Sequence, residues 1–167
     1  MNLYILRHGI AADRDSREYP DDDLRPLTGR GIDRMRRQVA GMNAIGIAPD
    51  VIITSPLARA AQTADIVQHG LESPPRKVSS TALVPESHPN EILHEIAAYH
   101  SAIADVMVVG HEPHLSNLVA YALTGSIADI IKIKKGALCK LSIDSANMPE
   151  RARLLWALTP RHMLRMA

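Results

Sequence analysis

The sequence predicts an α/β fold of three layers, in which a mixed, mostly parallel central sheet carries helices on both faces. The strands are predicted from short apolar runs at residues 3–7, 51–54, about 81–84 and 106–110. These runs alternate with segments whose apolar residues recur every three or four positions, which is typical of parallel strands joined by helices. Near the carboxyl end, Ala137–Ile143 and Arg153–Leu158 break this alternation and predict an antiparallel hairpin at an edge of the sheet.

The first two predicted helices have recognisable start and stop residues. Residues 28–45 place apolar side chains at spacings of three and four, and Thr28 is a good N-cap for this helix. In the second helix, Ser55 is the predicted N-cap, Pro56 is the first helical residue, and Gly70 is placed to end the helix. Both helices present one apolar face, which we expect to cover the sheet.

Proline and glycine bound the later elements. A third helix is predicted to begin near Pro89, and a fourth is predicted to begin at Pro113 and to end near Gly125. The pattern of residues 127–134 fits a strand and a helix equally well. A turn around Asp144–Pro149 is expected to join the two strands of the terminal hairpin.

Composition narrows the class of protein. The chain of 167 residues suits a single domain, 1–167, and 46% apolar with 22% charged residues is typical of soluble globular proteins. A net charge of +1 and an aromatic content of 3% argue against nucleic acid as a partner. No apolar run approaches the roughly 20 residues of a membrane-spanning helix. Because the first residues also lack the pattern of a signal peptide, we expect a cytoplasmic location and no membrane partner.

Basic side chains follow three of the predicted strands. Arg7 and His8 end the first strand before Gly9, Arg59 lies in the opening turn of the second helix, and His111 follows the fourth strand. The carboxyl ends of parallel strands meet at one edge of a sheet, where open α/β sheets bind their ligands. A neutral imidazole can attack phosphorus, and a guanidinium can hold the transferring oxygens. These residues therefore predict a phosphoryl-transfer site.

With these motifs the chain resembles the histidine phosphatase (phosphoglycerate mutase-like) superfamily, and within it the small SixA-type phosphohistidine phosphatase branch. The resemblance spans nearly the whole chain and rests on Arg7-His8-Gly9, Arg25-Pro26-Leu27-Thr28 with Gly31, Ser55-Pro56 with Arg59-Ala60 and Gln62-Thr63, Gly110-His111-Glu112-Pro113, and Leu158-Thr159-Pro160. It implies a phosphoglycerate mutase-like fold reduced to a minimal core without a cap domain. It also implies a hydrolase that acts on phosphohistidine in a protein of the histidine phosphotransfer type.

The expected mechanism is that of a metal-independent phosphatase with a histidine nucleophile. His8 forms a phosphohistidine intermediate, which water then hydrolyses, while Arg7 and Arg59 bind the equatorial phosphoryl oxygens. His111 adds a further donor, and also positive charge if it is protonated. Inorganic phosphate is expected to bind in the same pocket.

No metal or cofactor is expected. The histidines of His111-Glu112-Pro113-His114 lack the spacing of a zincin helix, where two histidines stand four residues apart. Asp21-Asp22-Asp23 is interpreted as an exposed loop rather than as a metal clamp. The histidines interpreted as solvated surface side chains are His69, His94, His100 and His162.

Four further residues are candidates for substrate binding. They are Gly9, Arg25, Glu86 and Ser87. Arg25 either lies near the phosphate pocket, as the resemblance implies, or forms a salt bridge with Asp22 or Asp23. Glu86 either supplies the acid that an alkoxide leaving group needs or is a solvated loop carboxylate, and Glu112 is a weaker candidate for that acid.

Two other functions stay open. One is a small-molecule phosphomonoesterase or mutase of the same superfamily, and the other is a non-catalytic module that binds phosphohistidine. A binding module needs the arginines but has no use for a nucleophile such as His8. Phosphohistidine is the preferred substrate because a chain of this length leaves little material for a lid, so the pocket is expected to be open and shallow.

Overall fold

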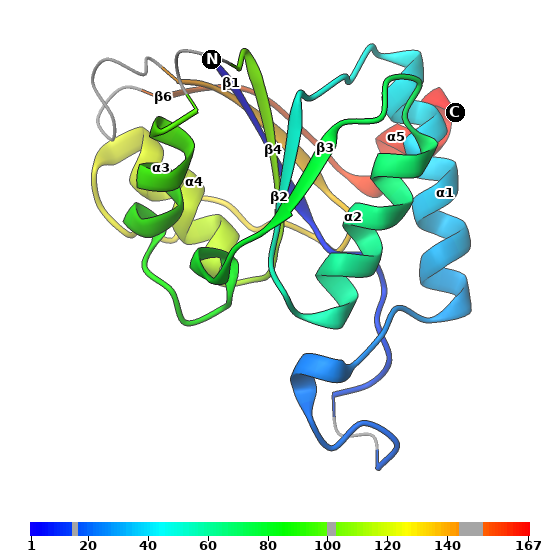
Figure 1. Cartoon of the computed structure of the whole chain (residues 1–167). Helices are drawn as coiled ribbons and strands as arrows, with labels where there is room; N and C mark the ends of the chain where they lie inside the picture. The colour runs from blue at the N-terminus through cyan, green and yellow to red at the C-terminus, as the bar shows by residue number, and fades with distance from the viewer. Residues whose placement is uncertain (15–16, 100–102, 144–151) are drawn as a thin grey trace.

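The computed structural model describes residues 1–14, 17–99, 103–143 and 152–167. Its sheet has the strand order β3-β2-β4-β1-β5-β6 (Figure 1). Strands β3, β2, β4 and β1 are parallel, whereas β5 pairs antiparallel with β1, and β6 pairs antiparallel with β5. The strands span Asn2–Arg7 (β1), Val51–Thr54 (β2), Arg76–Ser79 (β3), Asp105–Gly110 (β4), Leu138–Ile143 (β5) and Ala152–Leu158 (β6).

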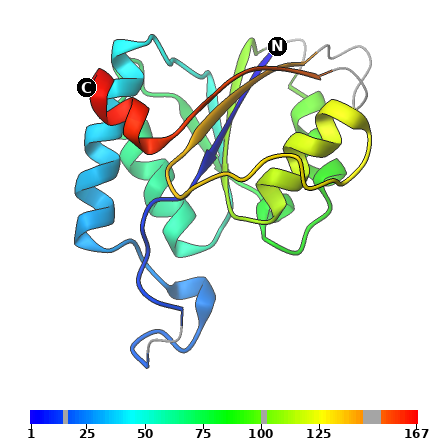
Figure 2. The same ribbon diagram turned by 180° about the vertical axis from the view of Figure 1, so that it is seen from behind.

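Helices cover both faces of the sheet, as the views from the front and from behind show (Figures 1 and 2). One face carries α1 (Gly29–Ala44), α2 (Ala58–Gly70) and α5 (Pro160–Met166), and the other carries α3 (Pro89–Ala97) and α4 (His114–Thr124). The predicted three-layer architecture with a mixed, mostly parallel sheet is therefore confirmed. The edge hairpin of β5 and β6 is confirmed too, and its predicted turn at Asp144–Pro149 lies outside the described residues.

Alternation along the parallel strands builds two separate cores. In β1, Leu3 and Ile5 pack into the core beneath α3 and α4, while Tyr4 and Leu6 pack into the core beneath α1 and α2. All four side chains are 0–2% exposed. A strand buried on both faces needs an apolar residue at every position, which is why β1, β2 and β4 stand out in the sequence as continuous apolar runs.

The helix ends largely agree with the sequence prediction. Thr28 caps α1 by accepting from the backbone N–H of Gly31 at 3.0 Å. The start predicted for α2 is wrong, because α2 begins at Ala58 with Leu57 at the N-cap position, and no side chain caps it. The hydroxyl of Ser55 faces His111 instead. Gly125 ends α4 in the left-handed conformation, with φ 76°.

The strand predicted at about residues 81–84 is wrong. The third strand is β3, and Thr81–Leu83 form a short 3-10 helix, η2, capped by the Ser80 hydroxyl. The apolar run is buried as a turn, since Leu83 is 0% exposed in the core beneath α3 and α4. Residues 127–134 form neither of the expected elements and run as irregular chain. The structure also adds α5, which the sequence analysis did not predict.

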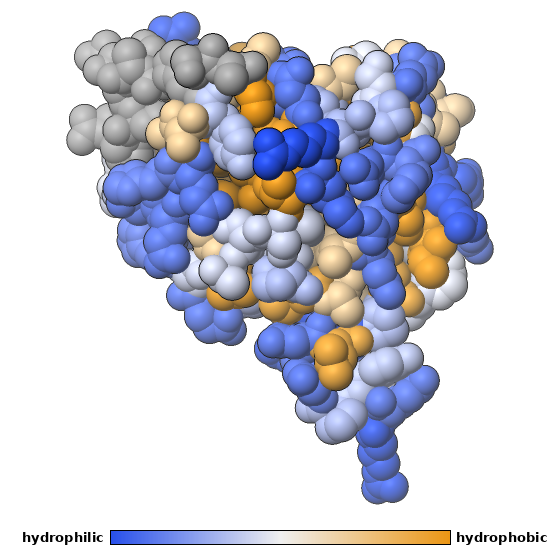
Figure 3. All heavy atoms as spheres, in the orientation of Figure 1, coloured by the Kyte–Doolittle hydropathy of each residue, from blue (hydrophilic) through white to orange (hydrophobic). Residues whose placement is uncertain are grey.

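A projecting arm connects β1 to α1. The described part of the arm comprises residues 11–14 and 17–27, and a bridge between Ala11 and Leu27 closes its base. It contains a 3-10 helix, η1 (Asp22–Leu24), and extends away from the sheet in Figures 1 and 2. Its surface is mostly hydrophilic (Figure 3). The arm brings Asp22 and Arg25 to the edge of the sheet, where Asp22 contacts Arg59 of α2.

Candidate active site

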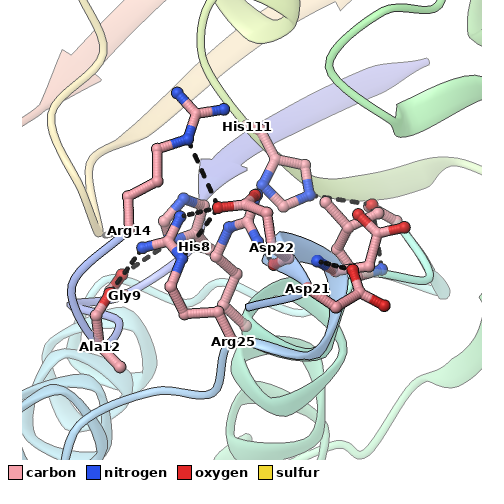
Figure 4. Close-up of polar contacts among 12 residues, drawn as sticks. His8, Gly9, Ala12, Arg14, Asp21, Asp22, Arg25 and His111 are labelled. Carbon is pink, nitrogen blue, oxygen red and sulfur yellow. Dashed lines mark hydrogen bonds and ion pairs between the residues drawn. The ribbon is translucent and has the colours of Figure 1, made fainter. Parts of the chain in front are cut away.

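The carboxyl ends of β1, β2 and β4 meet at one edge of the sheet and bring the predicted basic residues together. His8 follows β1, Arg59 lies in the first turn of α2, and His111 follows β4. The ring centroids of His8 and His111 are 5.0 Å apart (Figure 4). These residues line a cavity of about 570 Å³, whose other lining residues are Arg7, Ala12, Asp13, Arg14, Arg25, Pro85, Glu86, Glu112, Pro113 and Lys135.

The His8 ring is held as a neutral base. Its Nδ1 lies 2.7 Å from the backbone carbonyl of Gly9. A carbonyl oxygen only accepts hydrogen bonds, so Nδ1 carries the proton and Nε2 carries a free lone pair. Burial lowers the pKa of His8 to about 3; the Gly9 bond opposes this shift, and the charges of Arg59 and Arg7 add to it. His8 is therefore unprotonated at neutral pH.

His111 is neutral as well, although the sequence analysis left its protonation open. Burial, together with the nearby His8 and Arg59, lowers its pKa to about 2. The hydroxyl of Ser55 lies 2.9 Å from Nε2. Because this hydroxyl already accepts from the N–H of Leu57 at 3.4 Å, its own proton is available to Nε2. In that tautomer Nδ1 is a donor, and it is buried without a partner.

Arg7 and Arg59 each keep one buried donor unused. Nη1 of Arg7 donates to the carbonyl of Ile133 at 2.7 Å, and Arg59 uses its terminal nitrogens on Asp22. The Nε atoms of both arginines are buried and have no hydrogen-bond partner. Leaving a buried donor unpaired costs about 1–3 kcal/mol. A phosphoryl group in the cavity supplies acceptors of the kind these donors lack.

Asp22 lies at the centre of the ion pairs that the arm forms. Its carboxylate pairs with Arg25 at 3.0 Å, with Arg59 at 2.9 Å and with Arg14 at 3.5 Å (Figure 4). Burial raises the pKa of Asp22, but the charges of Arg59 and Arg25 outweigh this effect, and the net pKa is lowered. The interpretation of Asp21-Asp22-Asp23 as a merely exposed loop is wrong for Asp22, which is half-buried.

Of the four candidate substrate-binding residues, two line the cavity and two do not. Arg25 pairs with Asp22, as one alternative predicted, and it also lines the cavity. Glu86 lines the cavity too. Gly9 is buried and supports the site through its backbone, since its N–H donates to the Thr63 hydroxyl at 3.0 Å. Ser87 does not line the cavity, because its hydroxyl donates to the carbonyl of Thr81 and closes the turn after η2.

Comparisons with known proteins agree with this geometry. The model of the histidine phosphatase superfamily (branch 1) matches residues 3–80. A protein of Picosynechococcus sp. with no assigned function is 32% identical over 149 residues, which are 89% of this chain and 88% of that protein. The chain belongs to the histidine phosphatase superfamily. Phosphohistidine phosphatase SixA of Escherichia coli is 28% identical over 165 residues, covering 96% of this chain and 94% of SixA.

The fold agrees with that membership. The solved structure of the protein histidine phosphatase SixA with tungstate superposes with a TM-score of 0.83 at 25% identity, covering 98% of this chain and 99% of that one. Tungstate is a tetrahedral oxyanion, like phosphate. The phosphoglycerate mutase-like fold expected from the histidine phosphatase resemblance is therefore confirmed.

The sequence analysis missed two residues at the site, Asp22 beside the cavity and Lys135 in its lining. Asp22 was assigned to a solvated loop, and Lys135 was not considered, although burial and the charges of Arg7 and Arg25 lower its pKa. Gly136, with φ 77°, follows Lys135 and donates its N–H to the carbonyls of Arg7 and His8 at 3.0 Å. The Lys-Gly pair next to a predicted strand is the one feature of the sequence that points to this position.

The described residues contain no group of side chains suited to bind a metal ion. Among residues 1–14, 17–99, 103–143 and 152–167, no three His, Cys, Asp or Glu side chains are grouped so as to hold a metal ion. Over the same part of the chain, no helix is long and apolar enough to cross a membrane. His69, His94 and His162 lie on the surface as expected, and His100 is outside the described residues.

Proposed function

We propose that this member of the histidine phosphatase superfamily is a metal-independent phosphohistidine phosphatase whose nucleophile is His8. The observation that carries the proposal is the contact between Nδ1 of His8 and the Gly9 carbonyl, at 2.7 Å. This contact leaves the Nε2 lone pair for attack in a cavity that Arg7 and Arg59 also line. The similarity to SixA of Escherichia coli supports the same activity.

In the first step, Nε2 of His8 attacks phosphorus and the bond from phosphorus to the substrate nitrogen breaks. The substrate imidazole leaves as a neutral ring if its other nitrogen carries a proton. His8 becomes a phosphoimidazolium, whose Nδ1–H points to the Gly9 carbonyl at 2.7 Å. That hydrogen bond stabilises the new positive charge. In the second step, water attacks phosphorus, the bond to Nε2 breaks, and neutral His8 and inorganic phosphate are formed with release of one proton.

The cationic side chains hold the transferring group. In phosphoryl transfer, a protein acts mainly by stabilising the negative charge on the equatorial oxygens of the transferring group. The buried Nε atoms of Arg7 and Arg59, together with Nδ1 of His111, are donors that lack partners. We assign them to these oxygens. The same burial lowers the pKa values of His8 and His111. The low pKa of His8 keeps the nucleophile unprotonated.

The substrate class is inferred from the contacts and exposure of the two glutamates that line the cavity, Glu86 and Glu112. Both oxygens of Glu112 have structural partners, since Oε1 accepts from the N–H of Ile133 at 2.7 Å and Oε2 accepts from the Ser116 hydroxyl at 2.5 Å. Glu86 is exposed on the loop after η2. An alkoxide leaving group needs a proton from such an acid, whereas a phosphorylated imidazole leaves without one. We therefore infer a phosphorylated histidine of a partner protein as the substrate.

Trapping the intermediate tests the nucleophile. Wild-type protein quenched during turnover of phosphoramidate is expected to carry an acid-labile, base-stable phosphoryl group on His8, and turnover in EDTA is expected to equal turnover without it. His8→Ala is expected to abolish both turnover and labelling. His94→Ala, which removes an exposed histidine, is the matched control and should behave as the wild type. A phosphoryl group on another residue, or substantial turnover by His8→Ala, would contradict the assignment.

A small-molecule phosphomonoesterase is the second candidate, and Glu86 is the residue that favours it, because it lines the cavity. We expect Glu86→Gln to lose less than about fivefold in turnover of phosphohistidine, since that leaving group needs little acid catalysis. Rates with a phosphohistidine protein and with p-nitrophenyl phosphate and an alkyl phosphate should be measured side by side. Faster turnover of the alkyl ester, abolished by Glu86→Gln, would establish the esterase instead.

A further inference from the structure

Both terminal nitrogens of Arg59 are bound to one residue of the arm. Nη1 donates to the backbone carbonyl of Asp22 at 2.7 Å, and Nη2 donates to its carboxylate Oδ2 at 2.9 Å. The Arg59 side chain is 4% exposed. Only its Nε is left, buried and without a partner. The plane of this guanidinium is therefore fixed by Asp22 before any phosphoryl group binds.

The other carboxylate oxygen of Asp22 holds a second arginine. Oδ1 accepts from Nε of Arg25 at 3.0 Å and lies 3.0 Å from its Nη2. Nη1 of Arg25 donates to the carbonyl of Ala12 at 2.6 Å. Asp22 thus joins the start of α2 to the arm, and Figure 4 shows Asp22, Arg25 and Ala12 of the arm side by side near His8.

A carboxylate between two arginines beside a phosphate pocket has two possible roles. It either occupies the place of the phosphoryl group and competes with it, or it orients the arginines from behind. Two observations decide between them. Asp22 is not among the residues that line the cavity, although Arg25 and Arg59 are. Its backbone carbonyl binds Arg59 as well, and a carbonyl in the chain cannot swing aside as a side chain can.

We propose that Asp22 is a positioning residue that fixes the guanidinium of Arg59, so that its Nε is presented to the transferring phosphoryl group. The inference rests on the proposed function in one respect, namely that Arg59 binds the phosphoryl oxygens. It adds that the arm is part of the active site and that its acidic residue serves the transition state. A misplacement of about 1 Å costs on the order of 100-fold in rate, so a fixed guanidinium plane has a large effect on turnover.

Asp22→Asn tests the proposal, with Asp23→Asn as the matched control. Both variants remove one negative charge from η1, but Asp23 forms no ion pair among the described residues. Binding of orthovanadate, which adopts the trigonal geometry of the transition state, and of inorganic phosphate should be measured by calorimetry, together with turnover of phosphoramidate. A reversible loss of folded protein lowers the apparent affinity for both anions by the same factor, so a change in the ratio of orthovanadate affinity to phosphate affinity reports on the site and not on stability.

Asp22→Asn is expected to weaken orthovanadate binding and to lower kcat by on the order of 10- to 100-fold. Phosphate affinity should stay the same or increase, because a negative charge has been removed. In an Arg59→Ala background, Asp22→Asn should cause no further loss of orthovanadate binding. Equal behaviour of Asp22→Asn and Asp23→Asn would overturn the inference, and so would tighter orthovanadate binding with faster turnover. A wild type that binds neither anion would instead refute the proposed function along with it.

Discussion

Arg59 is the residue through which the sequence motif, the arm and the cavity are connected. It is almost fully buried, at 3% exposure, and burial lowers its pKa while the charge of Asp22 opposes that change. A buried guanidinium is retained only where it is paired. Asp22 provides the permanent partner, and the remaining donor, Nε, is available to a ligand.

Arg59→Ala is expected to lower kcat/KM for phosphoramidate by about 100- to 1,000-fold, or about 3–4 kcal/mol, because one preorganised charged donor is removed. Arg59→Lys keeps the charge but loses the planar fork, so an intermediate loss is expected. Steady-state kinetics with Arg36→Ala as control checks this, since Arg36 lies on α1 with a side chain 70% exposed. A loss below about tenfold in Arg59→Ala would remove Arg59 from the site.

The histidines and arginines that line the cavity could be predicted from the sequence because of their positions after the strands. His8 and His111 each follow a strand buried on both faces, and a continuous apolar run marks such a strand clearly. The contribution of Asp22 could not be predicted, because it depends on contacts with Arg59, which lies 37 residues away in the chain. A contact between residues so far apart in the chain leaves no pattern in the spacing of apolar or polar residues.

At the scale of elements, the errors of the sequence analysis have a common cause. Strand β3 lies at the edge of the sheet and has a half-exposed, charged sequence, so no apolar run marks it. The neighbouring apolar residues of η2 are buried as a turn rather than as a strand. Helix α5 is only Pro160–Met166, too short to show a helical period, and Met163 is the residue that anchors it, at 0% exposure.

The packing of α5 on α1 depends on the small size of Gly41. A Cβ atom at this position would collide with the backbone carbonyl of Met163. We expect Gly41→Ala to lower the free energy of unfolding by about 1–3 kcal/mol, as overpacking does. Gly29→Ala is the control, because no atom lies within 4 Å of its added Cβ. Urea unfolding measures both variants, and equal stability of the two would show that α5 does not approach α1 so closely.

At the scale of the whole molecule, three buried histidines make stability depend on pH. Burial lowers the pKa to about 3 in His8, to about 2 in His111 and to about 4 in His114. His114 is 1% exposed, and neither of its ring nitrogens has a partner. In the unfolded chain each histidine takes up a proton near pH 6.5. Between these values the unfolded state binds more protons than the native state, so acid favours unfolding.

The contribution of these histidines to the free energy of unfolding is therefore expected to be constant above about pH 7 and to fall as the pH decreases below about 6.5. Each of the three histidines contributes a slope of up to about 1.4 kcal/mol per pH unit, which persists until its native pKa is reached.

Replacing His114 by Leu removes one titrating group outside the cavity and should reduce the slope between pH 6 and 4.5 by about one third. His94→Leu, in an exposed position of α3, should leave the slope unchanged. Urea unfolding followed by circular dichroism across this pH range measures the slope for each variant. If His114→Leu and the wild type lose stability equally as the pH falls, His114 is protonated in the native state, and its burial does not control the acid sensitivity of the fold.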